Sequence, residues 1–121
     1  MLSFACCSLS SVFIDRNKIF RYNEFMAKQM IMGNQAIALG ALKAGVNLVA
    51  GYPGTPSSEI IEFISKYKDK TGTYVEWSVN EKAAVEVAAG ASYAGSRTLV
   101  TMKQVGLNVA SDPVMCQKIT M

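Results

Sequence analysis

The chain has 121 residues, of which 50% are hydrophobic and 17% are charged, and its formal net charge is +3. This length suits one domain or part of one, and the composition is typical of a globular protein. The 12 basic residues form no basic run, so we expect no nucleic-acid partner. The apolar stretches are interrupted well before the roughly 20 residues that a bilayer span requires, so we expect no membrane partner.

The chain contains no histidine, and its three cysteines are Cys6, Cys7 and Cys116. The absence of histidine excludes Ser-His-Asp and Cys-His nucleophiles. The cysteine spacing gives neither a C-x-x-C redox pair nor a four-cysteine zinc or iron-sulfur set, so we expect no metal site in this chain and a reducing, cytoplasmic setting. Acid-base chemistry must therefore depend on carboxylates or on a cofactor.

Residues 1–25 differ in composition from the rest of the chain. They lack the basic segment that precedes the apolar part of a signal peptide, so we interpret them as a poorly ordered N-terminal extension. The folded unit is predicted to cover residues 26–121, with a natural start at Met26, and to be truncated at its C-terminus.

The first regular elements follow Gly33. Asn34 is expected to cap a helix that ends near Gly45, and residues 46–50 form a short apolar run typical of a buried strand. The next segment, G-Y-P-G-T-P-S-S-E, is rich in turn formers, and it predicts Thr55 as the N-cap of a helix with Pro56 in its first position. The apolar residues of this helix have helical spacing: Ile60, Phe63, Ile64 and Tyr67.

After a turn at 69–72, residues 73–79 alternate as in a strand, and Trp77 on their apolar face is expected in the core. A small-residue helix follows at 81–95, with Asn80 as its N-cap, and then a strand at 97–102. A loop and a short helix stopped by Pro113 complete the pattern. Strands that alternate with helices indicate an α/β fold with a parallel sheet. About three strands are fewer than the usual five or six, so the sheet is expected to be incomplete.

Glu81 leads the inward face of the small-residue helix. The positions that share this face are Ala84, Val85, Ala88, Ala89 and Ser92. A face of small residues allows close approach by another helix or by a flat ligand. On the helix alone, the simpler interpretation of Glu81 is a carboxylate that complements the helix dipole, an effect of about 0.3–1 kcal/mol.

The loops at the carboxyl ends of the predicted strands lie at 52–58, 80–81 and 103–108, and ligands bind at this edge of open α/β sheets. The first loop matches neither G-x-x-x-x-G-K-[ST] nor G-x-G-x-x-G. Its helix N-terminus and the hydroxyls of Thr55, Ser57 and Ser58 suit a carboxylate or another small anion, although a plain turn between strand and helix gives the same pattern. Lys103 and Gln104 are either polar contacts in the same cleft or solvated loop residues.

Five segments carry a resemblance to a known family. They are M-G-N-Q-A-I-A-L-G-A-L-K-A-G-V, G-Y-P-G-T-P-S-S-E-I, Y-V-E-W-S-V-N-E-K, V-A-A-G-A-S-Y-A-G-S-R and V-T-M-K-Q-V-G-L-N-V-A-S-D-P. From about Gly33 to Met115 the chain resembles the pyrimidine-binding domain of the thiamine-diphosphate-dependent 2-oxoacid:ferredoxin oxidoreductases. Within that family it is most similar to the alpha subunit of the indolepyruvate enzymes.

The resemblance implies roles for individual residues. The family's Y-P-x-T-P-S loop places its threonine against the thiamine and the substrate, which matches Thr55, with Pro53 in the same loop. The glutamate that opens the small-residue helix contacts N1′ of the aminopyrimidine, which matches Glu81 as the catalytic group. Lys103 and Gln104 are further candidates for contacts with thiamine diphosphate.

The resemblance also implies an activity. The family oxidatively decarboxylates 2-oxo acids, here indolepyruvate or another aryl pyruvate; iron-sulfur clusters pass the electrons to ferredoxin, and coenzyme A takes the acyl group. A separate domain or subunit with a G-D-G type motif binds the diphosphate and Mg²⁺. This chain carries neither that motif nor the cluster cysteines, so we expect half of a thiamine-diphosphate site that is inactive alone. The implied partners are the remaining domains or pyrophosphate-site subunit, a beta subunit and ferredoxin.

Two alternatives remain open on sequence grounds. The chain could be a non-catalytic truncated remnant or an interaction module, or the pyrimidine domain of a non-oxidative 2-oxo acid decarboxylase. Binding of thiamine diphosphate with a partner domain would separate the first alternative from the enzyme, and reduction of ferredoxin would separate the second.

Overall fold

The computed structural model describes residues 30–119, in which strands and helices alternate along the chain. The expected extension at 1–25 and the start at Met26 lie outside the described residues. The elements in chain order are α1 (Gly33–Lys43), β1 (Leu48–Gly51), α2 (Ser58–Ser65), α3 (Lys68–Thr71), β2 (Tyr74–Trp77), α4 (Glu81–Tyr93), β3 (Thr98–Thr101), α5 (Gly106–Val109) and α6 (Ser111–Ile119). Across this described range, no helix is both long enough and apolar enough to cross a bilayer.

The strands form a parallel sheet in the order β2-β1-β3, so the first strand in the sequence lies in the centre. Leu48 pairs with Tyr74 on one side and with Thr98 on the other. The central strand is an apolar run because helices cover both of its faces, and Val49 and Ala50 are fully buried. The predicted α/β fold, with a parallel sheet and flanking helices, is confirmed.

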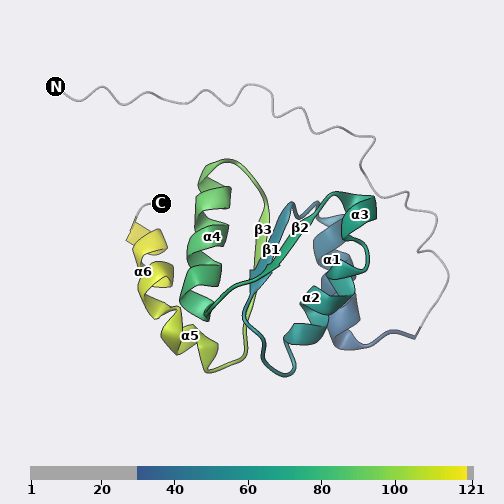
Figure 1. Ribbon diagram of the computed structural model, residues 1–121, viewed down its shortest axis with the longest axis horizontal. Helices are drawn as coiled ribbons and strands as arrows, with labels where there is room; N and C mark the ends of the chain where they lie inside the picture. The colour runs from purple at the N-terminus through teal and green to yellow at the C-terminus, as the bar shows by residue number, and fades with distance from the viewer. Residues whose placement is uncertain (1–29, 120–121) are drawn as a thin grey trace.

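Helices lie on both faces of the sheet (Figure 1). One face carries α1 and α2, and the other carries α4, with α5 and α6 on the outer side of α4. On the α2 face, Ile60, Ile61 and Ile64 pack against Val46 and Val49 in the main hydrophobic cluster. Burying one such aliphatic side chain contributes about 1.5–3 kcal/mol, so this face supplies most of the hydrophobic stabilisation.

The α4 face is built from shorter side chains. The helix begins as predicted, because Oδ1 of Asn80 accepts a hydrogen bond from the backbone N–H of Ala83 at 2.7 Å. Its buried positions are Glu81, Ala84, Val85 and Ala88. The prediction of the buried face is confirmed for these four positions, but it extended too far: Ala89 is half-buried and Ser92 is exposed, because the last turns of α4 extend beyond the sheet edge that covers the first ones. Glu81, which leads the face, lies inside the fold.

The start of α2 differs from the prediction. Thr55 was expected as the N-cap with Pro56 in the first helical position, but the N-cap is Ser57 and the helix begins at Ser58. The Ser57 hydroxyl donates a hydrogen bond to the Gly54 carbonyl, and the Gly54 N–H donates one to Ser58 Oγ, both at 2.8 Å. These bonds close a turn over 54–57, so Thr55 lies in that turn and the helix starts after it.

The start of α1 also differs. The helix begins at Gly33 after Met32, although the sequence favours Asn34 as the cap. The Asn34 side-chain amide instead donates hydrogen bonds to the Glu59 carboxylate at 2.7 Å and to the Pro56 carbonyl at 3.1 Å. This side chain connects the beginnings of α1 and α2, and that long-range contact takes precedence over local capping.

The predictions for Pro113 and Trp77 were wrong. Pro113 does not stop a helix, because it is the third residue of α6. A proline is tolerated there, since the first N–H groups of a helix have no partner inside the helix. Trp77 is 45% exposed and not in the core, because it ends an edge strand that has a neighbour on one side only.

Candidate functional site

The carboxyl ends of the three strands lie together at one edge of the sheet, called here the site edge. Gly51 of β1 pairs with Trp77 of β2 and with Thr101 of β3, and the loops that follow them leave on the lower side of the sheet in Figure 1. In parallel α/β sheets, ligands bind in the crevice outside these ends. The predicted site residues all fall in these loops or at the start of the helix that follows.

Glu81 is the buried acidic residue of the site edge. It is the first residue of α4, and its exposed fraction is 5%. Within residues 30–119, no hydrogen bond or ion pair reaches its carboxylate. Thr101 Oγ1 is the fully buried side-chain oxygen without a partner in the described residues, and the Glu81 oxygens are not in that class, so they reach solvent at the site edge. Glu81 therefore retains hydrogen-bonding capacity that no other described part of the protein uses.

The Glu81 side chain lies against Gly106, the first residue of α5. A Cβ atom built on Gly106 would lie 2.7 Å from Oε1 of Glu81 and 2.8 Å from its Cγ. Gly106 itself is buried. The loop after β3 and the beginning of α4 thus meet directly at the carboxylate.

The turn before α2 presents Thr55 and Pro53 on the surface, where both are exposed. Of the three hydroxyls predicted to suit an anion, those of Ser57 and Ser58 are engaged with Gly54. The Thr55 hydroxyl has no partner among the residues that the structure describes. It is therefore the hydroxyl of this turn that remains available to a ligand.

Lys103 connects the Thr55 turn to the loop after β3. Its side chain lies along Gly54, where a built Cβ would be 3.0 Å from Lys103 Cδ. Lys103 and Gln104 are both exposed, so their polar ends reach solvent at the site edge. The structure therefore places the Thr55 turn beside Lys103. The loop that contains Lys103 continues to Gly106, which lies against Glu81.

The centre of the site edge is tightly packed beneath these loops. A Cβ on Gly51 would lie 2.5 Å from Ile61 Cδ1 and 2.6 Å from the Thr101 carbonyl oxygen. Thr101 is 6% exposed, and its hydroxyl has no hydrogen-bond partner in the described part of the chain. Only a glycine fits at the end of β1, because side chains from β3 and α2 close over it.

Gly54 and Gly106 are contributors that the sequence analysis missed. In the sequence they stood out only by their place in the loops that follow β1 and β3, and a glycine in a loop more often marks a turn. That each of these glycines makes room for a side chain from another segment is visible only in the folded structure.

An exposed ion pair links the start of α4 to α6. Nζ of Lys82 lies 2.7 Å from Oδ2 of Asp112. The ammonium group lowers the pKa of the Asp112 carboxyl, and the carboxylate raises the pKa of the Lys82 amine. This pair helps to hold the outer helices against the element that carries Glu81.

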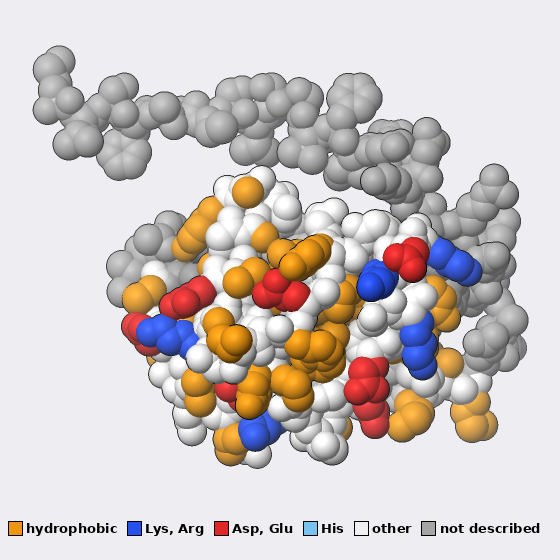
Figure 2. Space-filling view, in the orientation of Figure 1, with side chains coloured by type: hydrophobic (Ala, Val, Ile, Leu, Met, Phe, Trp, Pro, Cys, Tyr) orange, Lys and Arg blue, Asp and Glu red, His pale blue; other side chains and the backbone are white. Residues whose placement is uncertain are grey.

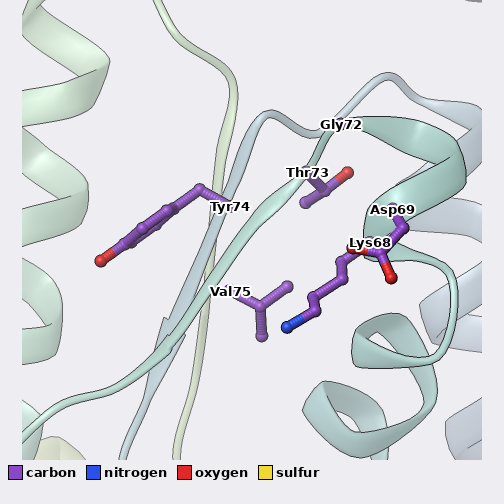
Figure 3. Close-up of a pocket in the computed structure, with 6 residues that line it drawn as sticks. All are labelled: Lys68, Asp69, Gly72, Thr73, Tyr74 and Val75. Atoms are coloured by element: carbon purple, nitrogen blue, oxygen red, sulfur yellow. The ribbon is translucent and has the colours of Figure 1, made fainter.

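A depression at the opposite end of β2 is not part of the site edge. Its lining residues are Lys68, Asp69, Gly72, Thr73, Tyr74 and Val75 (Figure 3). Figure 3 shows the Tyr74 ring directed away from Lys68 and Asp69, on the other side of the strand. The depression lies at the amino end of the strand and contains none of the predicted site residues.

Hydrophobic side chains also gather over the middle of the surface in Figure 2, where β2 lies in Figure 1. Tyr74, Trp77 and Val79 are the large apolar residues exposed on β2 and the turn after it.

Among the residues that the structure describes, no group of three or more Cys, Asp or Glu side chains could hold a metal ion. The candidate site at the carboxyl ends of the strands is centred on the carboxylate of Glu81.

Comparisons with known proteins match this arrangement. A family model described as "Pyruvate flavodoxin/ferredoxin oxidoreductase, thiamine diP-bdg" matches residues 39–116. The indolepyruvate oxidoreductase subunit IorA of Archaeoglobus fulgidus is 53% identical over 91 residues, which is 72% of this chain and 15% of that protein. The ketoisovalerate oxidoreductase subunit VorB of Methanothermobacter thermautotrophicus is 35% identical over 89 residues, 74% of this chain and 25% of that protein.

A solved structure shares the fold. The 2-oxoglutarate:ferredoxin oxidoreductase from Magnetococcus marinus, with 2-oxoglutarate, coenzyme A and succinyl-CoA bound, superposes with a TM-score of 0.63 at 29% identity. The match covers 65% of this chain and 14% of that one. The chain therefore spans between about one seventh and one quarter of the length of these relatives.

Proposed function

The chain belongs to the thiamine-diphosphate-binding family of the pyruvate flavodoxin/ferredoxin oxidoreductases, and we propose that it supplies the aminopyrimidine half of a thiamine-diphosphate site. The complete enzyme would be a 2-oxoacid:ferredoxin oxidoreductase that converts a 2-oxo acid and coenzyme A to an acyl-CoA and passes the electrons to ferredoxin. The observation that carries this proposal is Glu81, a residue only 5% exposed whose carboxylate has no hydrogen-bond partner within residues 30–119.

The residues around Glu81 fit an aminopyrimidine ring. A flat heteroaromatic ring requires an approach without bulky side chains, and the residue beside the Glu81 carboxylate is Gly106, which has none. Ala84 and Ala88 are buried on α4 against the strands, where they support the helix that carries Glu81. A ring nitrogen at hydrogen-bond distance would satisfy the carboxylate that the protein itself leaves unpaired. Burial strengthens such a hydrogen bond, because the surrounding dielectric is low.

Each residue then has a definite task. Glu81 exchanges a hydrogen bond with N1′ of the aminopyrimidine and so controls the proton at that atom. Asn80 caps α4 and fixes the backbone from which Glu81 extends. Thr55 offers its free hydroxyl to the cofactor and the 2-oxo acid, beside Pro53. Lys103 and Gln104 contribute polar groups from the next loop.

Thiamine diphosphate, when bound, supplies the nucleophilic carbon that adds to the carbonyl group of a 2-oxo acid. The relatives support an aryl pyruvate as substrate, since the indolepyruvate oxidoreductase subunits are about half identical to this chain and the ketoisovalerate subunit is 35% identical. The diphosphate group, Mg²⁺ and iron-sulfur clusters would be held by further domains or by partner subunits, which also bind ferredoxin and coenzyme A.

The proposal is tested by combining the chain with a candidate pyrophosphate-domain partner and measuring thiamine-diphosphate affinity by calorimetry. Glu81→Gln should weaken binding or slow exchange of the C2 proton, because an amide cannot replace the carboxylate at N1′. The matched control is Glu86→Gln, which alters an exposed carboxylate on the same helix and should leave both quantities unchanged.

The other outcomes identify the alternatives. If no partner gives cofactor binding, the chain is a remnant or an interaction module and the proposal fails. If the complex decarboxylates an aryl pyruvate without reducing ferredoxin or a viologen dye, the chain belongs to a non-oxidative decarboxylase. Binding that is identical in wild type and Glu81→Gln, together with unchanged C2 proton exchange, would remove Glu81 from the site.

A further inference from the structure

We propose that Gly106 is a positioning residue for Glu81, because the missing side chain at residue 106 leaves the space in which the Glu81 carboxylate lies. The catalytic meaning of this inference rests on the proposed function. The contact itself is a property of the fold and can be tested separately.

The space requirement follows from the contact distances. A Cβ on Gly106 would lie 2.7 Å from Glu81 Oε1, 2.8 Å from Cγ and 3.1 Å from Cδ. The two shortest of these separations are closer than carbon and oxygen atoms tolerate without a shift. Three atoms of the same side chain are affected, and a rotation of the terminal carboxylate alone would not relieve the contact with Cγ.

Backbone conformation does not account for this glycine. The described glycines with a left-handed backbone are Gly45, Gly72 and Gly95, and Gly106 is not one of them. At Gly106 an alanine would be compatible with the helical backbone and would favour the helix. The reason for glycine at this position is therefore the neighbouring carboxylate.

The turn at Gly106 is fixed locally, because its N–H donates a hydrogen bond to the Lys103 carbonyl at 2.9 Å and its carbonyl accepts one from the Ala110 N–H at 3.0 Å. The helix α5 leads directly into α6, which packs on α4 and is joined to it by the Lys82–Asp112 pair. An outward shift of α5 would disturb that packing, whereas the Glu81 side chain has no hydrogen bonds of its own in the described structure. A methyl group at 106 is therefore expected to displace the Glu81 side chain.

The first test is a double-mutant cycle measured by urea unfolding of the full chain. Gly106→Ala should lower the unfolding midpoint when Glu81 is present and raise it in the Glu81→Ala background, where the clash is gone and only the helix preference remains. The control is Gly90→Ala on α4, where a built Cβ meets nothing within 4 Å. It should change the midpoint equally in both backgrounds. Equal effects of Gly106→Ala in both backgrounds would overturn the inference.

The second test measures positioning in the complete oxidoreductase that contains this chain. A misplacement of a catalytic group by 1 Å costs about 10²-fold in rate, so Gly106→Ala should slow C2 proton exchange by about tenfold to a hundredfold. The KM for the 2-oxo acid should change little, and Gly90→Ala should behave as wild type. Exchange at the wild-type rate in Gly106→Ala would overturn the inference.

The two failures can be told apart. If Glu81→Gln exchanges the C2 proton as fast as wild type, the proposed function of Glu81 fails, and the unfolding cycle still decides whether Gly106 makes room for its side chain. If Glu81→Gln is slow and Gly106→Ala is normal in both tests, the proposed function stands and the role of Gly106 is refuted.

Discussion

The two faces of the sheet are packed with side chains of very different size. The α2 face buries Ile60, Ile61 and Ile64, whereas α4 presents Ala84 and Ala88 to the same strands. Because hydrophobic stabilisation scales with the apolar area removed from water, the isoleucine face contributes far more of it than the alanine face. The residues that stabilise the fold most are therefore concentrated on one face, whereas the candidate acid, Glu81, begins a helix on the other.

The alanine face relies on other interactions for its order. The Asn80 cap fixes the first turn of α4, and the Lys82–Asp112 pair joins that turn to α6. Each contributes less than a buried aliphatic side chain. The small buried residues let the α4 backbone lie close to the sheet, and Glu81 leads that same face at the site edge.

Ile64→Ala should produce the largest loss of stability. Ile64 is fully buried, and its truncation removes apolar contacts and leaves a cavity, at an expected cost of about 2–5 kcal/mol. The free energy of unfolding from urea titration measures this cost. Ile37→Ala in α1, where the side chain is 54% exposed, is the control and should cost much less. Equal losses for both would contradict the contrast between buried and exposed positions.

Ala84→Leu tests whether the other face has a size limit. Ala84 is fully buried, so a larger side chain is expected to destabilise the fold by about 1–3 kcal/mol through overpacking. It should also weaken binding of thiamine diphosphate in the assembled complex, because overpacking under α4 would shift the first turn that carries Glu81. Ala36→Leu, at an exposed position of α1, should leave stability and binding near wild type. A stabilised, cofactor-binding Ala84→Leu would show that the face is loosely packed.

Asn80→Ala should have an intermediate effect, because it removes the side-chain acceptor of the Ala83 N–H. The loss of such a cap costs about 1 kcal/mol. Amide hydrogen exchange should locate the change in the first turn of α4, next to Glu81. Asn108→Ala in α5 is the control, since its side chain is exposed and caps no helix. Unchanged exchange in α4 would argue against the cap.

Lys82→Gln should have the smallest effect, because the ion pair with Asp112 is exposed. Lys82 holds the pKa of the Asp112 carboxyl below its ordinary value, and the thiol of Cys116 adds to this shift. The ion pair therefore stabilises the folded state fully when the pH is above the ordinary pKa of an aspartic acid. This stabilisation is lost as the pH falls through the lowered pKa of Asp112 in the folded state. The difference in urea midpoint between wild type and Lys82→Gln should shrink over that acidic range and at high salt. Lys66→Gln, at the exposed C-cap of α2, should show no such pH dependence.

The sequence was sufficient to predict the local features of the fold. The alternating patterns identified the strands and the parallel connections, and Asn80 was recognised as a cap because capping depends on residues three positions apart. The spacing of Glu81, Ala84 and Ala88 correctly indicated a buried face. These features are encoded within a single element or between neighbouring elements.

Features that depend on contacts between distant segments were not predicted. Asn34 bonds to α2 instead of capping α1, and Trp77 is exposed because β2 lies at an edge. The spaces at Gly54 and Gly106 arise only where two loops meet. The roles of Thr55, Lys103 and Gln104 stay predictions, since no hydrogen bond to another residue of the described range 30–119 defines what their side chains do.

The central position of β1 sets the order in which the site can assemble. Leu48 of β1 pairs with Tyr74 of β2, 26 positions later, and with Thr98 of β3, 50 positions later. Pairing β1 with β3 therefore closes a longer loop and costs more chain entropy. The segment that pairs across the longer separation also contains Gly106, which lies against Glu81. A nascent chain that has emerged only as far as α4 lacks this segment, so its key acid is not yet covered by the loop after β3.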